Sequence, residues 1–443
     1  MGEGVLSPKK APVSIGERAA LFEDAGLERQ SGSLHFGGVR LSDIAEQAGT
    51  PVYVYNAETI RRQYRRLDSA LAAVPHKICY AVKANSNLAV LRVLRDLGAG
   101  ADIVSGGEMR RALAAGFGAE AIVFSGVGKS LPELEAALAA GVGHIHLESA
   151  DELHMLAALA ERTGKTIGLG IRVNPDVTAD THPYISTGQG GIKFGVPFDQ
   201  VASLAQDIHR HPRLRLDNIA MHLGSQILDD KPYRQGMGKL KELLAAIRAA
   251  GVDTVTQVDI GGGLGIRYRN ETPLDPTVLA AAVVPFAKET GVTIVMEPGR
   301  FLVGSAGVLL TQVTSRKHSG GKDFVLVDAG MNDLVRPSHY QAYHDIVELE
   351  AAGRGEGEVD VVGPVCETGD FIAKDRMLPD VAAGERLAVL GAGAYGFVMA
   401  STYNSRPRPP EVLVDGGKWA IVRPREIVDS LFAGESAFPA WQG

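Results

Sequence analysis

The chain carries a lysine where a charged side chain needs a reason. Lys83 closes a short apolar run in the segment YAVKAN, and residues 78–82 before it have the composition of a buried strand. Lysine is rarely buried unless it is paired with another group or reacts with one. An amine at a strand end is most often a solvated charge, so Lys83 becomes informative only in the company of other reactive groups.

Three further features follow apolar runs later in the chain. His222 lies in MHLGS, a glycine triplet at 261–263 lies in DIGGGLG, and Glu297 lies in MEPGR. Each has an ordinary explanation, because histidine can be a hydrogen-bonded core residue, glycine serves many tight turns, and Glu297 before Pro298 can simply end a strand. Together they supply an amine, an imidazole, bare backbone N–H groups and a carboxylate.

That combination fits pyridoxal 5′-phosphate. A lysine amine forms a Schiff base with this cofactor, and a carboxylate beside the pyridine nitrogen keeps it protonated, so that the ring accepts electrons. Backbone N–H groups of glycines can approach a phosphate closely, and an imidazole can stack on the ring. The residues predict a pyridoxal-phosphate site, provided that the fold brings them together.

The elements between about residues 52 and 305 would do so. Short β-rich apolar runs alternate with helical stretches rich in alanine and leucine, which favours a parallel sheet. Eight runs suit a closed (β/α)₈ barrel better than the alternative, an open doubly wound sheet. The runs are 78–83, 102–105, 121–125, 144–148, 167–173, 217–222, 256–261 and 292–297, and the helical stretches are 87–97, 107–115, 131–140, 151–163, 198–210, 233–250 and 276–289.

Such a barrel would place the reactive residues at one end. Catalytic groups of (β/α)₈ barrels lie at the carboxyl ends of the strands, and phosphate sites often lie in the loops after strands seven and eight. Lys83, His222, the glycine triplet and Glu297 all follow strand candidates. Other polar residues lie at or near the remaining strand ends: Asp102, Ser105, Glu148, Arg172 and Asn174.

The pattern changes after about residue 305. Runs at 307–314, 324–328, 358–362, 386–390 and 411–414 lack long helices between them, which indicates a mostly β second domain. The segment 181–195 has the composition of a mobile loop near the barrel mouth. We predict an N-terminal extension with some helix at 1–32, a strand contribution to the β domain at 33–55, a cofactor-binding barrel at 56–305 and a C-terminal β domain at 306–443.

Composition narrows the classes of function. A chain of 443 residues that is 45% apolar can bury a sizeable core, and its net charge of −7 gives no basic surface for nucleic acid. No apolar stretch reaches the roughly 18 residues that cross a bilayer, and the N-terminus lacks an apolar signal core. Two cysteines, Cys79 and Cys366, argue against a disulfide framework and for a reducing cytoplasm. We expect a small-molecule substrate, with no nucleic acid and no membrane as partner.

The motifs YAVKAN, HLGSQ, GGGLG, EPGR, CETGD and GAYGF occur in this order, followed by YNSRPRPPEVLVDG. From about residue 35 to the end, the chain therefore resembles the diaminopimelate decarboxylases. They belong to the barrel-type pyridoxal-phosphate decarboxylases, with the ornithine and arginine enzymes as relatives. The resemblance implies a homodimer with shared active sites that converts meso-2,6-diaminopimelate to L-lysine and CO₂, the last step of lysine biosynthesis by this route. It also implies reaction at the D-configured centre.

The resemblance also implies roles for matching residues. Lys83 carries the cofactor, His222 stacks on its ring and Glu297 faces the pyridinium nitrogen. Tyr395, in GAYGF, reaches the cofactor or substrate from the second domain, and Ser225 and the glycines lie near the phosphate. The expected cofactor-binding set is Lys83, His222, Ser225, Gly262, Gly263, Glu297, Gly299, Arg300 and Tyr395.

Catalysis by the same resemblance uses Lys83, His222 and Cys366. Cys366 is the expected proton donor, because an ordinary thiol is largely protonated at neutral pH; its neighbours alone suit a buried inert cysteine equally well. Cys366 and Glu367 are expected to come from the other subunit of the dimer. Cys79, inside the run 78–83, is expected in the core.

The expected substrate-binding set is Arg300, Arg336, Tyr340, Glu367 and Tyr395. A distal carboxylate of the substrate pairs well with an arginine fork, and a distal ammonium pairs with a carboxylate. Diaminopimelate offers both groups at its second centre, whereas ornithine and lysine would leave the arginines unpaired. Sites that bury polar groups for one substrate reject analogues without the match.

Four other hypotheses stay open. The chain could be a related decarboxylase acting on ornithine, arginine or a carboxylated polyamine, or a barrel racemase, although no opposed catalytic base is evident. It could bind pyridoxal phosphate without catalysis. It could also be a metalloenzyme using His144 and His146, whose spacing puts both on one face of a strand. That pair lacks a clear third ligand, and we expect no metal.

Overall fold

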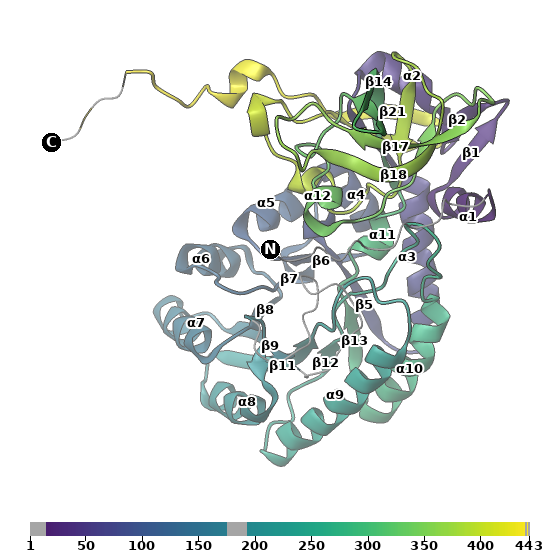
Figure 1. Cartoon of the computed structure of the whole chain (residues 1–443). Coiled ribbons are helices and arrows are strands. Elements are labelled where there is room, and N and C mark those ends of the chain that lie inside the picture. Colours follow the sequence, from purple (N-terminus) through teal and green to yellow (C-terminus); the bar gives the residue numbers. More distant parts are fainter. Residues whose placement is uncertain (1–14, 175–192, 439–440, 442–443) are drawn as a thin grey trace, which may run out of the picture. The chain divides into compact units, whose positions relative to one another are not determined.

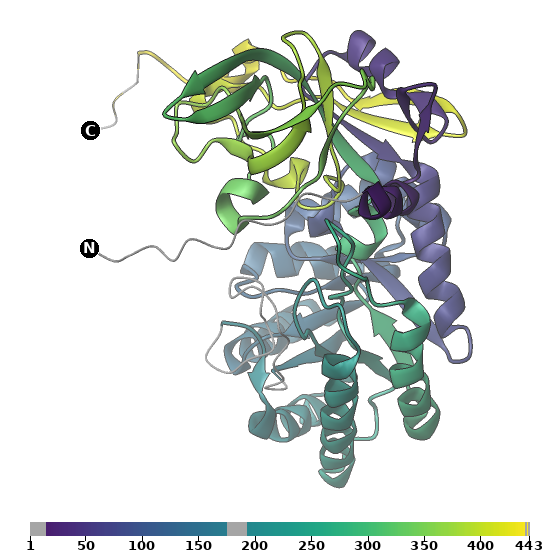
Figure 2. The same cartoon turned by 45° about the vertical axis from the view of Figure 1, so that its right-hand side comes forward.

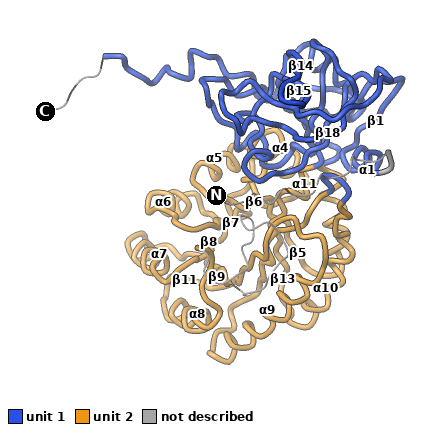
Figure 3. Tube along the Cα trace, viewed as in Figure 1, with its two compact units in different colours: residues 1–59, 267–270, 305–443 blue, residues 60–266, 271–304 orange. Residues whose placement is uncertain are grey.

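The structure of the chain is a computed structural model that describes residues 15–174, 193–438 and 441. It divides into two compact units (Figure 3). Unit 1 comprises Met1–Thr59, Arg267–Asn270 and Ser305–Gly443, and unit 2 comprises Ile60–Ile266 and Glu271–Gly304. Most of the segment 181–195, expected to be a mobile loop, lies outside the described residues.

Unit 2 is a closed parallel barrel. Within the described chain, its ring order is β5–β6–β7–β8–β9–β11–β12–β13, and pairing of β13 with β5 closes the ring. A short strand, β10 (Val196–Pro197), pairs parallel with the carboxyl end of β9. The predicted (β/α)₈ barrel is therefore confirmed, and the open doubly wound sheet is excluded. The barrel strands are β5 (His76–Ala81), β6 (Gly100–Ile103), β7 (Ile122–Phe124), β8 (His144–Leu147), β9 (Ile167–Asn174), β11 (Leu214–Met221), β12 (Gln257–Asp259) and β13 (Thr293–Met296).

Helices alternate with these strands and lie outside the ring (Figure 1). They are α3 (Ala57–Leu71), α4 (Leu88–Asp96), α5 (Gly106–Ala114), α6 (Leu131–Ala140), α7 (Ala150–Thr163), α8 (Val201–Arg210), α9 (Lys231–Ala249), α10 (Pro276–Thr290) and α11 (Arg300–Val303), with short 3₁₀ turns η1 (Val82–Ala84), η2 (Ala119–Ala121) and η4 (Phe198–Gln200).

Serine caps explain why helices start so soon after strands. Ser105 Oγ accepts a hydrogen bond from the Glu108 N–H at the start of α5, and Ser149 Oγ accepts one from the Glu152 N–H at the start of α7, both at 3.2 Å. Such caps satisfy N–H groups that the first turn leaves open. The links from strand to helix are therefore short, and polar side chains gather at the carboxyl ends of the strands.

The barrel interior contains an apolar cluster to which three of its strands contribute, β5, β7 and β13. Cys79, Val123 and Val295 form this buried cluster, which confirms the expectation that Cys79 belongs to the core. Gly100 on β6 leaves room for it, because a Cβ at Gly100 would lie 2.8 Å from the Cys79 sulfur. Such close packing is typical of protein interiors.

Unit 1 is mostly β structure. Its long strand β14 pairs antiparallel with β4, β15 and β19, and β4 pairs parallel with β20, so strands from both ends of the chain share one sheet (Figure 2). The strands are β1 (Leu27–Gln30), β2 (Ser33–Phe36), β3 (Val39–Arg40), β4 (Val52–Asn56), β14 (Gly307–Ser319), β15 (Lys322–Val327), β16 (Ile346–Glu348), β17 (Glu356–Val362), β18 (Phe371–Pro379), β19 (Arg386–Val389), β20 (Glu411–Asp415) and β21 (Lys418–Arg423).

The helices of unit 1 include one that the sequence patterns missed. Residues 41–48, inside the segment expected to contribute strand, form a helix, because Leu41, Ile44 and Ala45 recur at helical spacing and are all buried. The helices are α1 (Ile15–Ala25), α2 (Leu41–Ala48) and α12 (Arg336–Tyr340), with 3₁₀ turns η5 (Phe397–Met399), η6 (Tyr403–Ser405) and η7 (Val428–Leu431).

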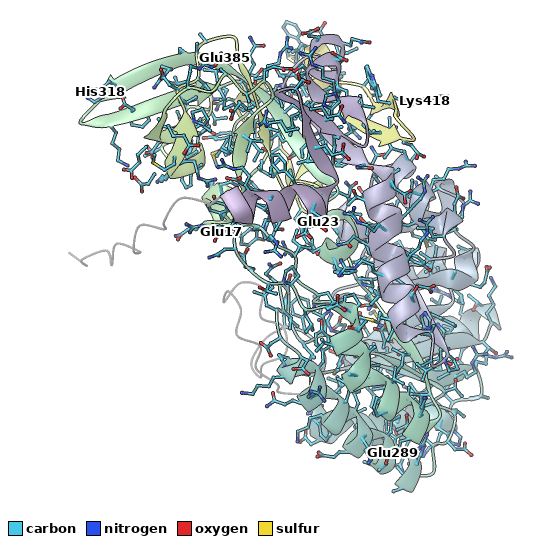
Figure 4. All side chains as sticks on the ribbon, turned by 90° about the vertical axis from the view of Figure 1, so that its right-hand side faces the viewer. Glu17, Glu23, Glu289, His318, Glu385 and Lys418 are labelled. Carbon is cyan, nitrogen blue, oxygen red and sulfur yellow. The ribbon has the colours of Figure 1, made fainter. Side chains whose placement is uncertain are left out.

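Charged side chains mark the outer surfaces of both units. Glu289 lies on α10 of the barrel, whereas His318 and Lys418 lie at the β14–β15 and β20–β21 hairpins of unit 1 (Figure 4). Among the described helices, none combines the length and apolar character of a membrane span.

Candidate active site

The amine of Lys83 is held at the carboxyl end of β5. Lys83 lies in η1, directly after the strand, and its Nζ donates to Oδ2 of Asp102 on β6 at 2.9 Å. The Lys83 side chain is 38% exposed, whereas Asp102 is fully buried. A buried carboxylate thus fixes the direction of an amine that remains accessible.

Glu297 follows β13 and presents a carboxylate that is almost buried. Its side chain is 10% exposed, and Oε1 accepts a hydrogen bond from Ser125 Oγ at 3.1 Å. Burial raises the pKa of Glu297 to about 7; the charge of Asp102 adds to the rise, and Lys83 and Arg172 oppose it. The position therefore favours a cation, or a donor with a proton to share, beside this carboxylate.

His222 follows β11 and supplies a neutral imidazole. Its Nδ1 accepts a hydrogen bond from the Gly262 N–H at 3.3 Å. Burial lowers the pKa of His222 to about 3, and the positive charges of Arg172 and Lys83 lower it further. A neutral ring suits stacking on an aromatic cofactor.

The glycine triplet joins the loops that follow β11 and β12. Ile227 N–H donates to Gly263 O at 2.8 Å, and Gly265 N–H donates to Ile227 O at 3.0 Å. A Cβ at Gly262 would lie 2.4 Å from Glu297 O, and Gly263 has a φ of +95° that side chains rarely adopt. Glycine is needed here for close backbone packing, which also leaves the loop surface bare.

Arg300 brings a buried cation next to this loop pair. Arg300 is 8% exposed, and its Nη2 donates to Ser225 Oγ at 3.0 Å. Gly299, directly before α11, is buried as well. A guanidinium and a hydroxyl beside bare backbone are donors that suit a phosphate.

The donor set of unit 2 fits pyridoxal 5′-phosphate. Its requirements are a directed amine, a carboxylate for the ring nitrogen, a flat neutral ring, and donors for a phosphate, and the barrel supplies each of them. The structure brings together, in one unit, all the expected cofactor residues except Tyr395.

Several buried residues in this region carried no role in the sequence analysis. Asp102 was noted only for its position, and Ser125 and Asp259 not at all. Asp259 is fully buried on β12, with its Oδ1 accepting from the Gly261 N–H at 2.7 Å. The available signal was the one that singled out Lys83, a charged residue inside an apolar run.

The two histidines of the metalloenzyme hypothesis face different partners. His144 Nε2 lies 2.7 Å from Asp217 Oδ1, whereas His146 Nδ1 lies 3.1 Å from Ser125 Oγ. The ligand atoms of His146, Asp259 and Glu297 instead lie within 4.8 Å of one another. His144 is not part of that group.

Unit 1 holds the other expected site residues, and α12 carries two of them. Arg336 is buried; its Nη1 donates to His344 Nε2 at 2.9 Å, and its guanidinium lies 4.8 Å from the centre of the Tyr268 ring. Tyr340 is half-buried at the end of the helix. Arg336 is thus held rigidly within unit 1.

Cys366 and Glu367 are exposed in a loop that is held in place by hydrogen bonds. Asp370 accepts hydrogen bonds from the Val365 and Met331 N–H groups, both at 2.6 Å. Asn404 Oδ1 accepts from the Cys366 N–H at 2.8 Å. The thiol is therefore accessible on an ordered loop.

Tyr395 is half-buried and adopts a φ of +56°. Few non-glycine residues do so, and such conformations persist where the surroundings impose them, often at functional sites.

A closed (β/α)₈ barrel with a directed lysine and a donor set for pyridoxal phosphate defines a class, the barrel-type pyridoxal-phosphate enzymes. A sequence model of the pyridoxal-dependent decarboxylases, for their pyridoxal-binding domain, matches residues 57–304. The chain is also 47% identical to a diaminopimelate decarboxylase over 91% of its own length. It therefore belongs to the diaminopimelate decarboxylases, a family of carboxy-lyases, and its cofactor is pyridoxal 5′-phosphate.

Similarity to individual relatives extends over nearly the whole chain. A diaminopimelate decarboxylase of Pseudomonas aeruginosa is 47% identical over 402 residues, which are 91% of this chain and 96% of the relative. The structure of the Helicobacter pylori enzyme with L-lysine covers 89% of this chain and 99% of that one, with 38% identity and a TM-score of 0.86. The M. jannaschii enzyme with L-lysine covers 93% and 98%, with 32% identity and a TM-score of 0.89.

Proposed function

We propose that this chain decarboxylates meso-2,6-diaminopimelate to L-lysine and CO₂. The observation that carries the proposal is the 47% identity to a diaminopimelate decarboxylase over 96% of that relative. Two solved relatives with L-lysine bound support the product. The donor set of the barrel supports the cofactor chemistry that the reaction needs.

Lys83 is proposed to carry the cofactor. When bound, pyridoxal phosphate supplies an electron sink for the pair released as CO₂ leaves. Asp102 orients the Lys83 amine through the 2.9 Å contact. Asp102 is fully buried whereas Lys83 is 38% exposed, so the carboxylate fixes the direction of an amine that the cofactor can still reach.

Glu297 is proposed to face the pyridine nitrogen, where its carboxylate stabilises the protonated ring. The raised pKa of Glu297 supports this role, because a cation beside a buried carboxylate offsets the cost of its burial. His222 is proposed to pack against the ring. Ser225, Gly262, Gly263, Gly299 and Arg300 are proposed to hold the phosphate.

The residues of unit 1 are proposed to serve the substrate. Arg336, Tyr340 and Tyr395 would bind it together with Arg300, and Cys366 would protonate the carbon that loses CO₂. Glu367 would hold the distal ammonium. We propose that Cys366 and Glu367 act on the active site of the second subunit in a homodimer, a role supported by the exposure of both side chains.

The substrate is tested by CO₂ release from the purified, cofactor-loaded protein. We expect release from meso-diaminopimelate, with L-lysine as product, and none from L-ornithine, L-arginine or L-lysine. Release from ornithine or arginine would contradict the assignment of Arg300, Arg336 and Glu367. Cofactor absorbance without release from any of the four would favour the racemase or the non-catalytic binder.

Sharing of the active site is tested by mixing two inactive variants. Lys83→Ala and Cys366→Ala would each disable every site of their own homodimer. Mixed dimers would contain one site with both residues intact, so the mixture should regain activity that neither variant shows alone. A mixture that stays inactive, although dimers exchange subunits, would show that Lys83 and Cys366 of one chain serve the same site.

A further inference from the structure

Beneath Glu297, the barrel buries a group of polar side chains for which the proposed function gives no role. Asp259 on β12 and His146 on β8 are fully buried or nearly so, and Ser125 follows β7. The ligand atoms of His146, Asp259 and Glu297 lie within 4.8 Å of one another. Burying two acids in contact is costly unless they share a proton.

We propose that Asp259 is a positioning residue that keeps the one proton shared by a buried carboxyl pair and donates it as a hydrogen bond to Glu297. Glu297 thereby stays ionised, with its charge available to the pyridinium. The inference rests on the proposed role of Glu297, and it adds the group that sets the charge of that carboxylate.

The hydrogen bonds of Asp259 suit a neutral carboxyl. Its Oδ1 accepts from the Gly261 N–H at 2.7 Å. Its Oδ2 is buried, and no donor within the described chain reaches it. A carboxyl oxygen of Asp259 lies within 4.8 Å of a carboxyl oxygen of Glu297. Two ionised carboxyls can only accept hydrogen bonds, so a hydrogen bond within this buried pair requires a proton on one of the two acids.

The surrounding charges assign the proton to Asp259. Its charged neighbours are Glu297 and, from β6, Asp102, and both are acidic; burial and these charges raise the pKa of Asp259 well above its usual value. Glu297 also feels the positive charges of Lys83 and Arg172, which favour its ionised form. The cations Lys83 and Arg172 act on Glu297, so the pair holds its proton on Asp259.

His146 and Ser125 give Glu297 a second donor. Ser125 Oγ donates to Glu297 Oε1, so the 3.1 Å contact between Ser125 Oγ and His146 Nδ1 places a proton on Nδ1. Burial, then the charges of His144, Lys129 and Arg172, lower the pKa of His146 well below its usual value. Gly170 on β9 leaves room for the ring, because a Cβ there would lie 2.4 Å from His146 Cδ2. A neutral His146 brings no positive charge to Glu297, so it does not neutralise the negative charge of this carboxylate.

The test compares Asp259→Asn with Asp259→Ala in the full chain. An asparagine amide can still donate to Glu297 and accept from Gly261, but it has no acidic proton. We expect Asp259→Asn to bind pyridoxal phosphate within about threefold of the native affinity, and Asp259→Ala to bind it at least about tenfold more weakly. Equal weakening of both variants would overturn the proposal, because it would mean that Asp259 acts as a charge.

Infrared spectroscopy locates the proton independently of activity. It needs only the native protein and asparagine variants, so it remains decisive if Asp259→Ala folds poorly. At about pH 8, above the pKa of about 7 for Glu297, the native protein should show the C=O band of a protonated carboxyl, with and without cofactor. Asp259→Asn should lack this band. The control Asp217→Asn should keep it, because burial is outweighed by the contacts with His144 at 2.7 Å and Arg215 at 2.8 Å, which lower the pKa of Asp217 and favour its ionised form.

Three outcomes would overturn the proposal directly. They are a native protein without the band, an Asp259→Asn variant that keeps it, and one equivalent of a divalent metal retained by dialysed native protein. Glu297→Gln separates this inference from the proposed function. If Glu297→Gln binds pyridoxal phosphate with native affinity, the proposed role of Glu297 is wrong, and so is the proposed purpose of Asp259. The location of the proton is decided separately, by the infrared band.

Discussion

Three barrel strands, β5, β7 and β13, carry an apolar side chain inside the barrel and are followed by a polar one at their carboxyl end. On β7 and β13, Val123 and Val295 belong to the buried apolar cluster, and Ser125 and Glu297 follow two residues later. On β5, Cys79 belongs to the cluster and Lys83 follows the strand. Because side chains two apart share one face of a strand, these three strands form an apolar layer followed by a polar layer toward their carboxyl ends.

The difference shows how the fold divides stability from chemistry. The apolar layer excludes water and packs closely, which stabilises the barrel. The polar layer holds Asp102, Asp259 and Glu297 in a buried place where the ionisation of one acid disfavours the ionisation of its neighbours. That arrangement costs stability in the protein without cofactor, and a cationic ring beside Glu297 would relieve part of the cost.

The largest effect should come from the reactive amine. Lys83→Ala should lower kcat by about 10⁴-fold or more, because no other group replaces the amine. Lys77→Ala is the matched control, since Lys77 lies on the same strand near its amino end and donates to Gln257 at 3.2 Å. Its kcat should stay near native. Comparable losses in both variants would mean that the two ends of β5 do not differ in role.

Glu297→Gln should have the next largest effect. Loss of the carboxylate beside the ring nitrogen should lower kcat by about 10²-fold, measured at saturating cofactor. Glu289→Gln is the control, because Glu289 lies on the outside of α10 and pairs with exposed Lys241 at 2.6 Å (Figure 4). Native turnover in Glu297→Gln would refute the assignment of this residue.

Val295→Ala should lower the stability of the protein and leave its turnover nearly unchanged. A cavity in the apolar layer should lower the free energy of unfolding by about 2 kcal/mol, while kcat per folded molecule stays within about twofold of native. Urea unfolding and steady-state kinetics measure the two quantities. Val278→Ala, at a position 41% exposed on α10, should change neither. A large loss of kcat in Val295→Ala would contradict the claim that the apolar layer contributes to stability and not to catalysis.

The smallest effect is a pH slope in the protein freed of cofactor. Burial raises the pKa of Glu297 to about 7, so between about pH 4.3 and 7 the folded state binds a proton that the unfolded state has lost. The stability contributed by that proton is lost as the pH rises through this window, by up to about 1.4 kcal/mol per pH unit.

Glu297→Gln should reduce this slope by about one proton, and Glu289→Gln should leave it unchanged. Urea unfolding at several pH values measures it. A native slope that persists in Glu297→Gln would mean that the carboxyl is not the group with the raised pKa.

The barrel could be predicted because each strand and helix follows from local patterns. Apolar runs of strand length alternate with helical spacing, and a barrel is the closed arrangement of eight such units. The helix α2 was missed because it has only eight residues and is flanked by strands. In so short a segment, apolar residues three or four apart were taken as strand character.

Individual site residues could be predicted where a motif or a misplaced charge marked them. Lys83 and Glu297 were such cases, and His222 and the glycines gained meaning only beside them. The pairing of Asp259 with Glu297 could not be predicted, because it depends on the register of two neighbouring strands, in which Asp259 lies opposite Val295. Proton sharing is a property of that contact and of its burial, and neither residue reveals it alone.

The identity of the lysine that carries the cofactor tests the account most directly. The barrel offers a contrast in Lys129, which is 5% exposed and donates to Gly126 O at 2.6 Å, His146 O at 2.7 Å and Glu152 Oε1 at 3.2 Å. Borohydride reduction of the loaded protein fixes the cofactor to the amine that carries it, and peptide mass mapping then identifies the residue. We predict that the label lies on Lys83 alone. Label on Lys129, or on any other lysine, would contradict the assignment of the polar end of the barrel as the active site.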